Sequence, residues 1–171
     1  MNIISLIRPK IKENPVIFFE QQLIYNSLGV VPEEEYLVPI GEAKVLREGK
    51  DITIVCWSYM VEQSLKAAKI LEDQGISVEV IDIRTLIPLD IDTIAASVKK
   101  TGKVVVTSQE VIQSGFASEI ITQIQECCFD WLDAPIQRLG APNGIPPSAE
   151  NLEKLFLPDA EKLVRIIKEK F

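Results

Sequence analysis

The chain has 171 residues, the size of one domain, and its 47% hydrophobic and 25% charged content is that of an ordinary globular protein. Its net charge of −7 argues against a protein that binds nucleic acid or an anionic membrane, because such a protein needs a basic face. The chain has no histidine, which excludes imidazole as a general base or metal ligand within it.

Residues 1–50 are predicted to form a lead-in segment before a domain over residues 51–171. The apolar run at residues 15–19 has the length and composition of a strand. A turn-rich loop follows, and its acidic triplet Glu33–Glu35 is typical of a solvated surface. Residues 37–40 are predicted to form a short strand.

Strands and helices alternate over the rest of the chain. Apolar and β-branched runs predict four strands, at residues 52–57, 78–83, 104–107 and 135–139. Apolar residues at helical spacing predict helices at 60–74, 91–100, 115–128 and from Ala160 to Phe171, with Asp90 as an N-cap and Gly75 and Gly102 as stops. This alternation requires crossover connections, so we predict a three-layer α/β domain with a mostly parallel sheet.

Polar residues follow the predicted strands, at the edge of the sheet where α/β proteins usually bind ligands. They are Ser58 and Tyr59, then Asp82, Arg84 and Thr85, then Ser108, Gln109 and Glu110, and finally the loop at residues 140–144. Neither GxGxxG nor GxxxxGK[ST] occurs, so no phosphate-binding loop is predicted.

None of these polar residues is predicted to be catalytic, cofactor-binding or metal-ligating. Glu110 is a candidate general acid or base, but it has no carboxylate partner nearby in sequence, so we expect it to be exposed or to cap a helix. Asp82 and Arg84 lie two residues apart and therefore on one face of a strand. We predict an ion pair that holds the turn, with an anion site at Arg84 as the alternative.

The three cysteines indicate a reducing compartment. Cys56, Cys127 and Cys128 are odd in number and form no CxxC pattern, so they are not a disulfide framework. Cys56 lies in an apolar run and is predicted to be a core residue, and adjacent cysteines are poorly placed to bridge one another. The sequence shows neither a signal-peptide pattern nor a membrane span, so we expect a cytoplasmic protein.

The final predicted helix ends at Phe171, where an aromatic side chain and a free carboxylate coincide. Its polar face carries charged residues, among them Asp159 and Glu161. The carboxylate is a candidate anchor for a basic partner through charge-assisted hydrogen bonds. The alternative is that Phe171 closes the core.

Five segments in order along the sequence carry a family resemblance: NPVIFFEQQLIYN, EYLVPIGEAKVLREGKDITIV, GISVEVIDIRTLIPLDIDTIAASVKKTGKVVV, FDWLDAPIQRL and NLEKLFLPDAEKLVRIIKE. They resemble the beta subunit of the decarboxylating component of 2-oxo acid dehydrogenases, the pyruvate dehydrogenase branch above all. IDIRTLIPLD together with VKKTGKVVV is specific to this family and its transketolase-like relatives.

The resemblance implies a transketolase C-terminal domain, with four parallel strands, one antiparallel strand and helices on both faces. It also implies a beta subunit about twice as long as this chain. The earlier half of such a subunit binds thiamine diphosphate and holds the activating glutamate and the active-site histidine, and the alpha subunit supplies the diphosphate and Mg²⁺ site. The chain therefore resembles a C-terminal fragment that alone binds no cofactor and is inactive, in agreement with its lack of histidine.

The resemblance further implies partners: the alpha subunit, a second beta subunit of the heterotetramer, and the peripheral subunit-binding domain of the acyltransferase. In some members the C-terminus of the beta subunit receives a basic residue of that last domain. Carried over by position, this makes Phe171, with Asp159 or Glu161 nearby, the predicted partner-binding residues. A protein without its partner domains exposes apolar surface, so we also expect dimers or weak self-association.

Two loops depart from the family pattern. SQEVIQSGFASEI replaces a glycine-rich segment and carries Ser118, and APNGIPPSA carries Asn143 and Ser148 where acidic and aromatic residues are common. Two alternatives stay open. One is the equivalent domain of another transketolase-type enzyme, such as deoxyxylulose-phosphate synthase. The other is a free-standing α/β ligand-binding module that uses the loops around Arg84 and Ser108.

Overall fold

The computed structural model describes residues 21–25, 27–30, 32–34 and 36–171, so the strand predicted at residues 15–19 lies outside the described residues. The strands are β1 (Lys44–Arg47), β2 (Ile52–Cys56), β3 (Val78–Asp82), β4 (Val104–Val111) and β5 (Gln137–Ala141). The α-helices are α1 (Tyr59–Glu72), α2 (Ile91–Thr101), α3 (Ala117–Cys128), α4 (Glu150–Phe156) and α5 (Ala160–Lys170). The 3-10 helices are η2 (Gln22–Ile24) and η3 (Phe129–Trp131).

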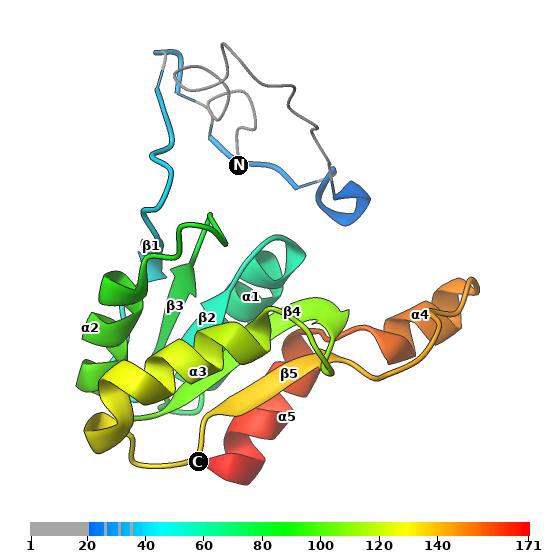
Figure 1. Cartoon of the computed structure of the whole chain (residues 1–171). Coiled ribbons are helices and arrows are strands. Elements are labelled where there is room, and N and C mark those ends of the chain that lie inside the picture. The colour runs from blue at the N-terminus through cyan, green and yellow to red at the C-terminus, as the bar shows by residue number, and fades with distance from the viewer. Residues whose placement is uncertain (1–20, 26, 31, 35) are drawn as a thin grey trace.

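The described residues form one five-stranded sheet in the order β1-β3-β2-β4-β5. The pairs β2–β3, β2–β4 and β4–β5 are parallel, and β1 pairs with β3 in the antiparallel sense. Figure 1 shows α2 and α3 on the near face of the sheet and α1 and α5 behind it. The expected fold class, a mostly parallel three-layer sheet with one antiparallel strand, is confirmed.

The core has two halves because successive side chains of a strand point to opposite faces of the sheet. Ile54 and Val80 pack against α1 and α5, whereas Val55 and Ile81 pack against α2 and α3. Every residue of β2 and β3 is buried, as expected for strands covered by helices on both faces. Among the described residues, no helix is both long and apolar enough to cross a membrane.

The predicted strand at residues 37–40 is wrong, and the edge strand lies further along, at β1. Pro39 has no backbone N–H to donate to a ladder, and Leu37 and Ile40 are exposed. The backbone then turns at Gly41, whose N–H donates to Thr85 Oγ1 at 3.0 Å, before it pairs with β3.

The bounds of β4 and β5 differ from the sequence predictions, and one helix was not predicted. β4 continues past Thr107 to Val111, because the ladder with β5 resumes after an irregularity and pairs Val111 with Ala141. β5 begins two residues later than expected, at Gln137, which pairs with Val105. The sequence showed no sign of α4, which has only seven residues and no side-chain cap.

The predicted caps of α2 are confirmed. Asp90 Oδ1 accepts from the N–H of Thr93 at 3.1 Å, and Asp90 Oδ2 accepts from the Thr93 hydroxyl at 2.7 Å and from the N–H of Ala43 at 2.8 Å. At the other end Gly102 has a φ of 65°, and its N–H donates to Val98 O at 2.8 Å. Asp90 therefore ties the start of α2 to the segment that leads into β1.

Replacing Asp90 with alanine is expected to lower the free energy of unfolding by about 1–2 kcal/mol at pH 7, the cost of losing an N-cap. Burial raises the pKa of Asp90, but the hydrogen bonds from Thr93 and Ala43 outweigh it and lower the pKa overall. A lowered pKa contributes stability above the unfolded-state value of about 3.9, and this is lost as the pH falls through the folded-state value. Urea unfolding at pH 7 and pH 3 checks this, with Asp92→Asn, an exposed neighbour, as the control. An equal loss at both pH values would contradict it.

Candidate functional site

The carboxyl ends of β2, β3, β4 and β5 lie at one edge of the sheet, the upper edge in Figure 1. The fold thus brings together the polar residues that the sequence placed after each strand. Three non-glycine residues in these loops have positive φ: Ser58 (56°), Arg84 (55°) and Ser114 (64°). A positive φ is strained for a residue other than glycine. Such residues are common at functional sites, where the surrounding structure holds the loop in this conformation.

Two aromatic side chains meet at this edge of the sheet. The loop after β2 leads to α1 on one face of the sheet, and the loop after β4 leads to α3 on the other. There the rings of Trp57 and Phe116 meet edge to face, with centroids 6.5 Å apart. Gln109 Oε1, nearby on β4, accepts a hydrogen bond from Gln21 Nε2 at 2.6 Å.

Asp82 is nearly buried at the same edge. Burial raises its pKa, and the hydrogen bond from the Arg84 backbone together with the charges of Arg84 and Lys44 offsets only part of this effect. The expected ion pair is not found among the described residues. Instead, the N–H of Arg84 donates to Asp82 Oδ1 at 3.1 Å, because the positive φ of Arg84 turns the backbone out of the strand direction.

Glu110 caps a helix, as expected. Its Oε1 accepts from the N–H of Ala117, the first residue of α3, at 2.8 Å. Val111 O and the Glu110 carboxylate lie so close to Gly115 that a Cβ on this residue would be 2.6 Å from Val111 O and 2.7 Å from Glu110 Oε1. Glu110 is therefore occupied in holding the loop, and Gly115 is required by the tight packing.

The two loops that depart from the family pattern are bonded to each other. The N–H of Gln113 donates to Asn143 Oδ1 at 3.2 Å, and Asn143 Nδ2 donates to Gln113 Oε1 at 2.8 Å. Ser118 Oγ accepts a hydrogen bond from the guanidinium of Arg138 on β5. Asn143 is thus bonded to the other loop and Ser118 to β5, contacts that no single segment of the sequence could reveal.

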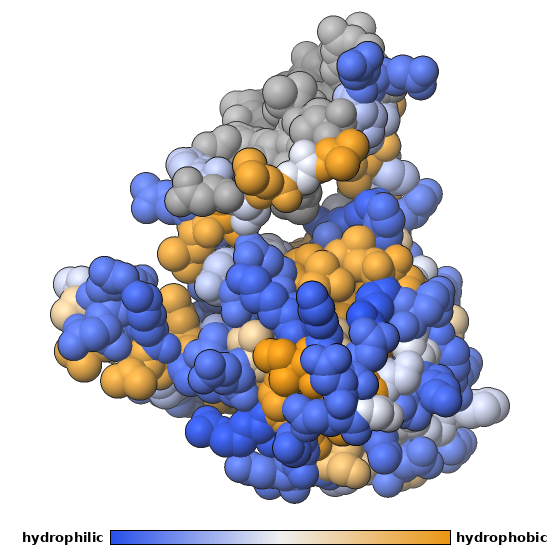
Figure 2. Space-filling view, turned by 180° about the vertical axis from the view of Figure 1, so that it is seen from behind, coloured by the Kyte–Doolittle hydropathy of each residue, from blue (hydrophilic) through white to orange (hydrophobic). Residues whose placement is uncertain are grey.

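Apolar side chains are exposed along this edge and on α4. Ile87 follows β3 and is 84% exposed, and Ile145 follows β5 and is 93% exposed. Leu155 of α4 is 74% exposed. Figure 2 shows apolar residues on the upper part of the body, below the N-terminal segment, and on the projecting arm that carries α4. Exposed apolar surface of this extent is typical of an interface with another domain or subunit.

Lys162 of α5 holds α4 in place. Its ammonium donates to Lys154 O at 3.2 Å, to Leu155 O at 2.8 Å and to Leu157 O, and it lies 3.7 Å from the carboxylate of Asp159. Lys154 and Leu155 belong to the last turn of α4 and Leu157 caps its end, so these carbonyls have no further helical partner. A side chain from α5 therefore fixes the direction in which α4 presents its apolar residues.

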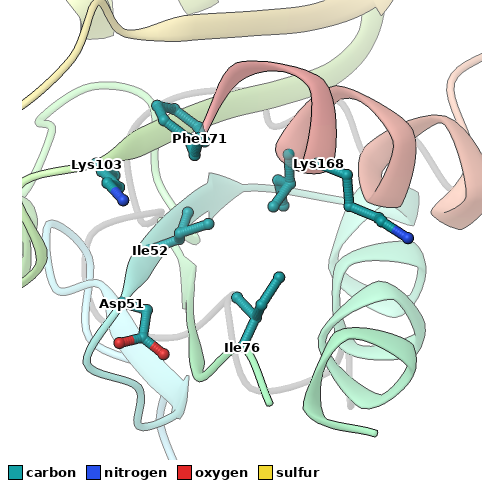
Figure 3. Close-up of a pocket in the computed structure, with 7 residues that line it drawn as sticks. Asp51, Ile52, Ile76, Lys103, Lys168 and Phe171 are labelled. Atoms are coloured by element: carbon teal, nitrogen blue, oxygen red, sulfur yellow. The ribbon is translucent and has the colours of Figure 1, made fainter. Parts of the chain in front are cut away.

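Phe171 lies at the opposite edge of the sheet, next to a pocket of about 300 Å³. Figure 3 shows it with Ile52, Ile76 and Lys103 around this pocket. Its ring packs against the core half formed by α1 and α5, which agrees with the core alternative for its side chain. The expectation that Asp159 or Glu161 lies near it is wrong, because they stand at the start of α5 and Phe171 follows its end, about 15–18 Å away along the helix.

Asp159 has a local role at the start of α5. Its Oδ1 accepts from the N–H of Lys162 at 2.8 Å and so caps the helix, while Glu161 is exposed.

The cysteines are free, as expected. Cys56 is buried in the core and burial raises its pKa to about 12, which leaves it an inert thiol.

The comparisons with known proteins agree with this architecture. The family described as "Transketolase, C-terminal domain" matches residues 41–163. The mitochondrial pyruvate dehydrogenase E1 component subunit beta of Dictyostelium discoideum is 44% identical over 160 residues, 91% of this chain and 45% of that protein. The corresponding subunit of Bacillus subtilis is 43% identical over 157 residues, 91% of this chain and 48% of that protein. The chain spans about half the length of the curated relatives it matches.

A solved structure supports the same conclusion. A split-gene transketolase, described as an inactive beta4 tetramer, superposes with a TM-score of 0.72 at 27% identity, and the match covers 84% of this chain and 46% of that protein. Together with the observed sheet order and the matched residues, this shows that the chain belongs to the transketolase C-terminal domain family and is similar to the beta subunits of pyruvate dehydrogenase E1.

Proposed function

We propose that the chain is the C-terminal domain of the beta subunit of a thiamine-diphosphate-dependent pyruvate dehydrogenase, and that it serves subunit assembly in the oxidative decarboxylation of pyruvate. The observation that carries this proposal is the exposed apolar edge at the carboxyl ends of the strands, in a protein more than 40% identical to E1 beta subunits over most of its length. Its partners there are the alpha subunit and a second beta subunit.

The catalytic chemistry is proposed to belong to the rest of the enzyme. Among the described residues, no three metal-ligating side chains gather, so they offer no donor set for Mg²⁺. We expect this chain to be inactive alone. The related split-gene transketolase is likewise described as inactive in its beta4 form.

Phe171 is proposed to contact the peripheral subunit-binding domain of the acyltransferase. Its ring stands beside a pocket open to solvent, with Lys103 and Lys168 at the rim. Asp159 and Glu161 lie at the far end of α5. They are therefore proposed to make a second contact with this domain, separate from that of Phe171. The free thiols agree with a cytoplasmic location, which is part of the same proposal.

The test is a chimera in which this chain replaces the equivalent half of the Bacillus subtilis beta subunit, co-expressed with the Bacillus alpha subunit. We expect the chimera to co-elute with the alpha subunit and to decarboxylate pyruvate when thiamine diphosphate is present, while the 171-residue chain alone does neither. In the chimera, Ile145→Asp is expected to weaken assembly at least 100-fold, about 3 kcal/mol, because the interface would bury an unpaired carboxylate.

Phe129→Asp is the matched control, because Phe129 is an exposed apolar residue that follows α3, away from the carboxyl-end edge. We expect it to leave assembly with the alpha subunit unchanged. A chimera that folds but does not associate, or equal effects of the two substitutions, would contradict the proposal.

A further inference from the structure

Two thiols lie side by side at the end of α3. Cys127 and Cys128 are its last two residues, and their Sγ atoms are 3.4 Å apart. The Cys127 side chain is exposed, and Cys128 is buried beneath it against α2, with Sγ 4.0 Å from Ala95 O. One sulfur therefore faces solvent, and the second is within reach of anything bound to the first.

The pair is poorly suited to form a disulfide. Adjacent Cα atoms across a trans peptide are about 3.8 Å apart, whereas a disulfide needs about 4.4–6.8 Å between its Cα atoms. An S–S bond of about 2.05 Å would also have to pull together sulfurs that now lie 3.4 Å apart. A single larger atom bonded to both sulfurs avoids both strains, because the sulfurs can keep nearly their present separation.

Two exposed aromatic side chains follow the pair directly in the sequence. Phe129 and Trp131 of η3, which directly follows the pair, are 66% and 55% exposed. The Lys99 ammonium lies 5.9 Å from the centroid of the Trp131 ring. Burial raises the pKa of Cys128 to about 11, and the positive charge of Lys99 opposes this effect. Cys128 is thus held as a neutral thiol, and Lys99 lies near both this thiol and the Trp131 ring.

The donor set limits the class of atom that can bind. Among the described residues, no group of three or more histidine, cysteine, aspartate or glutamate side chains could hold a metal ion. A structural zinc site, which takes four protein ligands, is therefore not available here. A polarisable, thiol-preferring atom that already carries one organic substituent needs only two more bonds, and two thiols alone can supply them.

We propose that Cys127 and Cys128 form a chelating dithiol site for trivalent organoarsenicals, with the organic substituent lying against Phe129 and Trp131. In the reaction of an arsine oxide with the pair, two arsenic–sulfur bonds form and the arsenic–oxygen bonds break. The oxygen leaves as water with the two thiol protons. Arsenic stays trivalent, so the step needs neither an oxidant nor a reductant.

The site is tested with phenylarsine oxide and the full 171-residue chain. Intact-mass spectrometry should show one adduct per molecule that survives excess glutathione and is removed by 2,3-dimercaptopropanol, together with a change in tryptophan fluorescence. The second arsenic–sulfur bond is intramolecular, so the pair should bind about 100-fold or more tightly than a single thiol.

Three variants separate the pair from other thiols. Cys127→Ser, at an exposed position, should lose the glutathione-resistant adduct without loss of fold, as circular dichroism would show. Cys128→Ala should lose it as well, and Cys56→Ala, which alters the buried core thiol, should keep it. An adduct retained in Cys127→Ser or lost in Cys56→Ala would overturn the proposal, as would a wild-type adduct that glutathione removes.

Discussion

Replacing Lys100 with methionine is expected to lower the free energy of unfolding by about 2–3 kcal/mol, because it leaves a buried carboxylate without its counter-charge. Glu79 on β3 is fully buried, and its Oε2 accepts from the Lys100 ammonium and from the N–H of Gly49 at 3.2 Å. Lys100 also contacts Glu48, an exposed carboxylate, at 2.9 Å. Glu79 Oε1 has no hydrogen-bond partner among the described residues, so the ammonium is the principal stabilising contact of this carboxylate.

Two variants test this cause. Glu48→Gln, which removes only the exposed partner, should change stability little. Adding Glu79→Gln to Lys100→Met should recover about 1 kcal/mol or more, because a buried amide costs less than a buried charge. Urea unfolding measures all three, and additive losses in the double variant would contradict the prediction.

The same pair predicts a loss of stability at high pH. Hydrogen bonds with Glu79 and Glu48 raise the pKa of Lys100. A raised pKa contributes stability that is fully present below the unfolded-state value of about 10.4 and is lost as the pH rises through the folded-state value. The free energy of unfolding of the wild-type protein should therefore fall at alkaline pH. Lys100→Met lacks the ammonium, so urea unfolding should show a smaller fall over the same pH range.

Replacing Phe171 with alanine is expected to weaken binding of a recombinant peripheral subunit-binding domain at least tenfold, if the proposed docking contact is correct. The same change should lower the free energy of unfolding by about 1–2 kcal/mol, because the half-buried ring packs on the core beside Ile52 and Ile167. Calorimetry measures the binding, and urea unfolding measures the stability.

Val164→Ala separates the two effects. Val164 is also on α5 and packs against the same half of the core, but it does not line the pocket beside Phe171. It should destabilise the protein without weakening the binding. Unchanged binding in Phe171→Ala would mean that the ring only closes the core.

Much of the fold was predictable from local signals. The buried strands β2 and β3 are continuous apolar runs, and α2 is bounded by Asp90 and Gly102, whose capping geometry depends on neighbours within four residues. The helix-capping role of Glu110 was likewise anticipated, because its target, the N–H of Ala117, lies only seven residues away. The segments that resemble E1 beta subunits also identified the family from sequence alone.

The missed features all depend on contacts between distant residues. β1 is a strand because it pairs with β3, more than thirty residues later in the sequence. The edge-to-face contact of Trp57 with Phe116 joins the loops that follow β2 and β4. The seven-residue α4 carries little periodic signal of its own, and Lys162 of α5 holds its end.

The sequence by itself determined the alternation of strands and helices, the caps and the family, because hydrophobic period and capping act over one or two turns of helix. Only the tertiary structure decided where the surfaces lie. It placed Phe171 and Asp159 at opposite ends of α5, it gathered exposed apolar side chains at the carboxyl-end edge, and it set the two sulfurs of Cys127 and Cys128 3.4 Å apart. The physical reason is that these features depend on packing in three dimensions, which no local pattern of residues encodes.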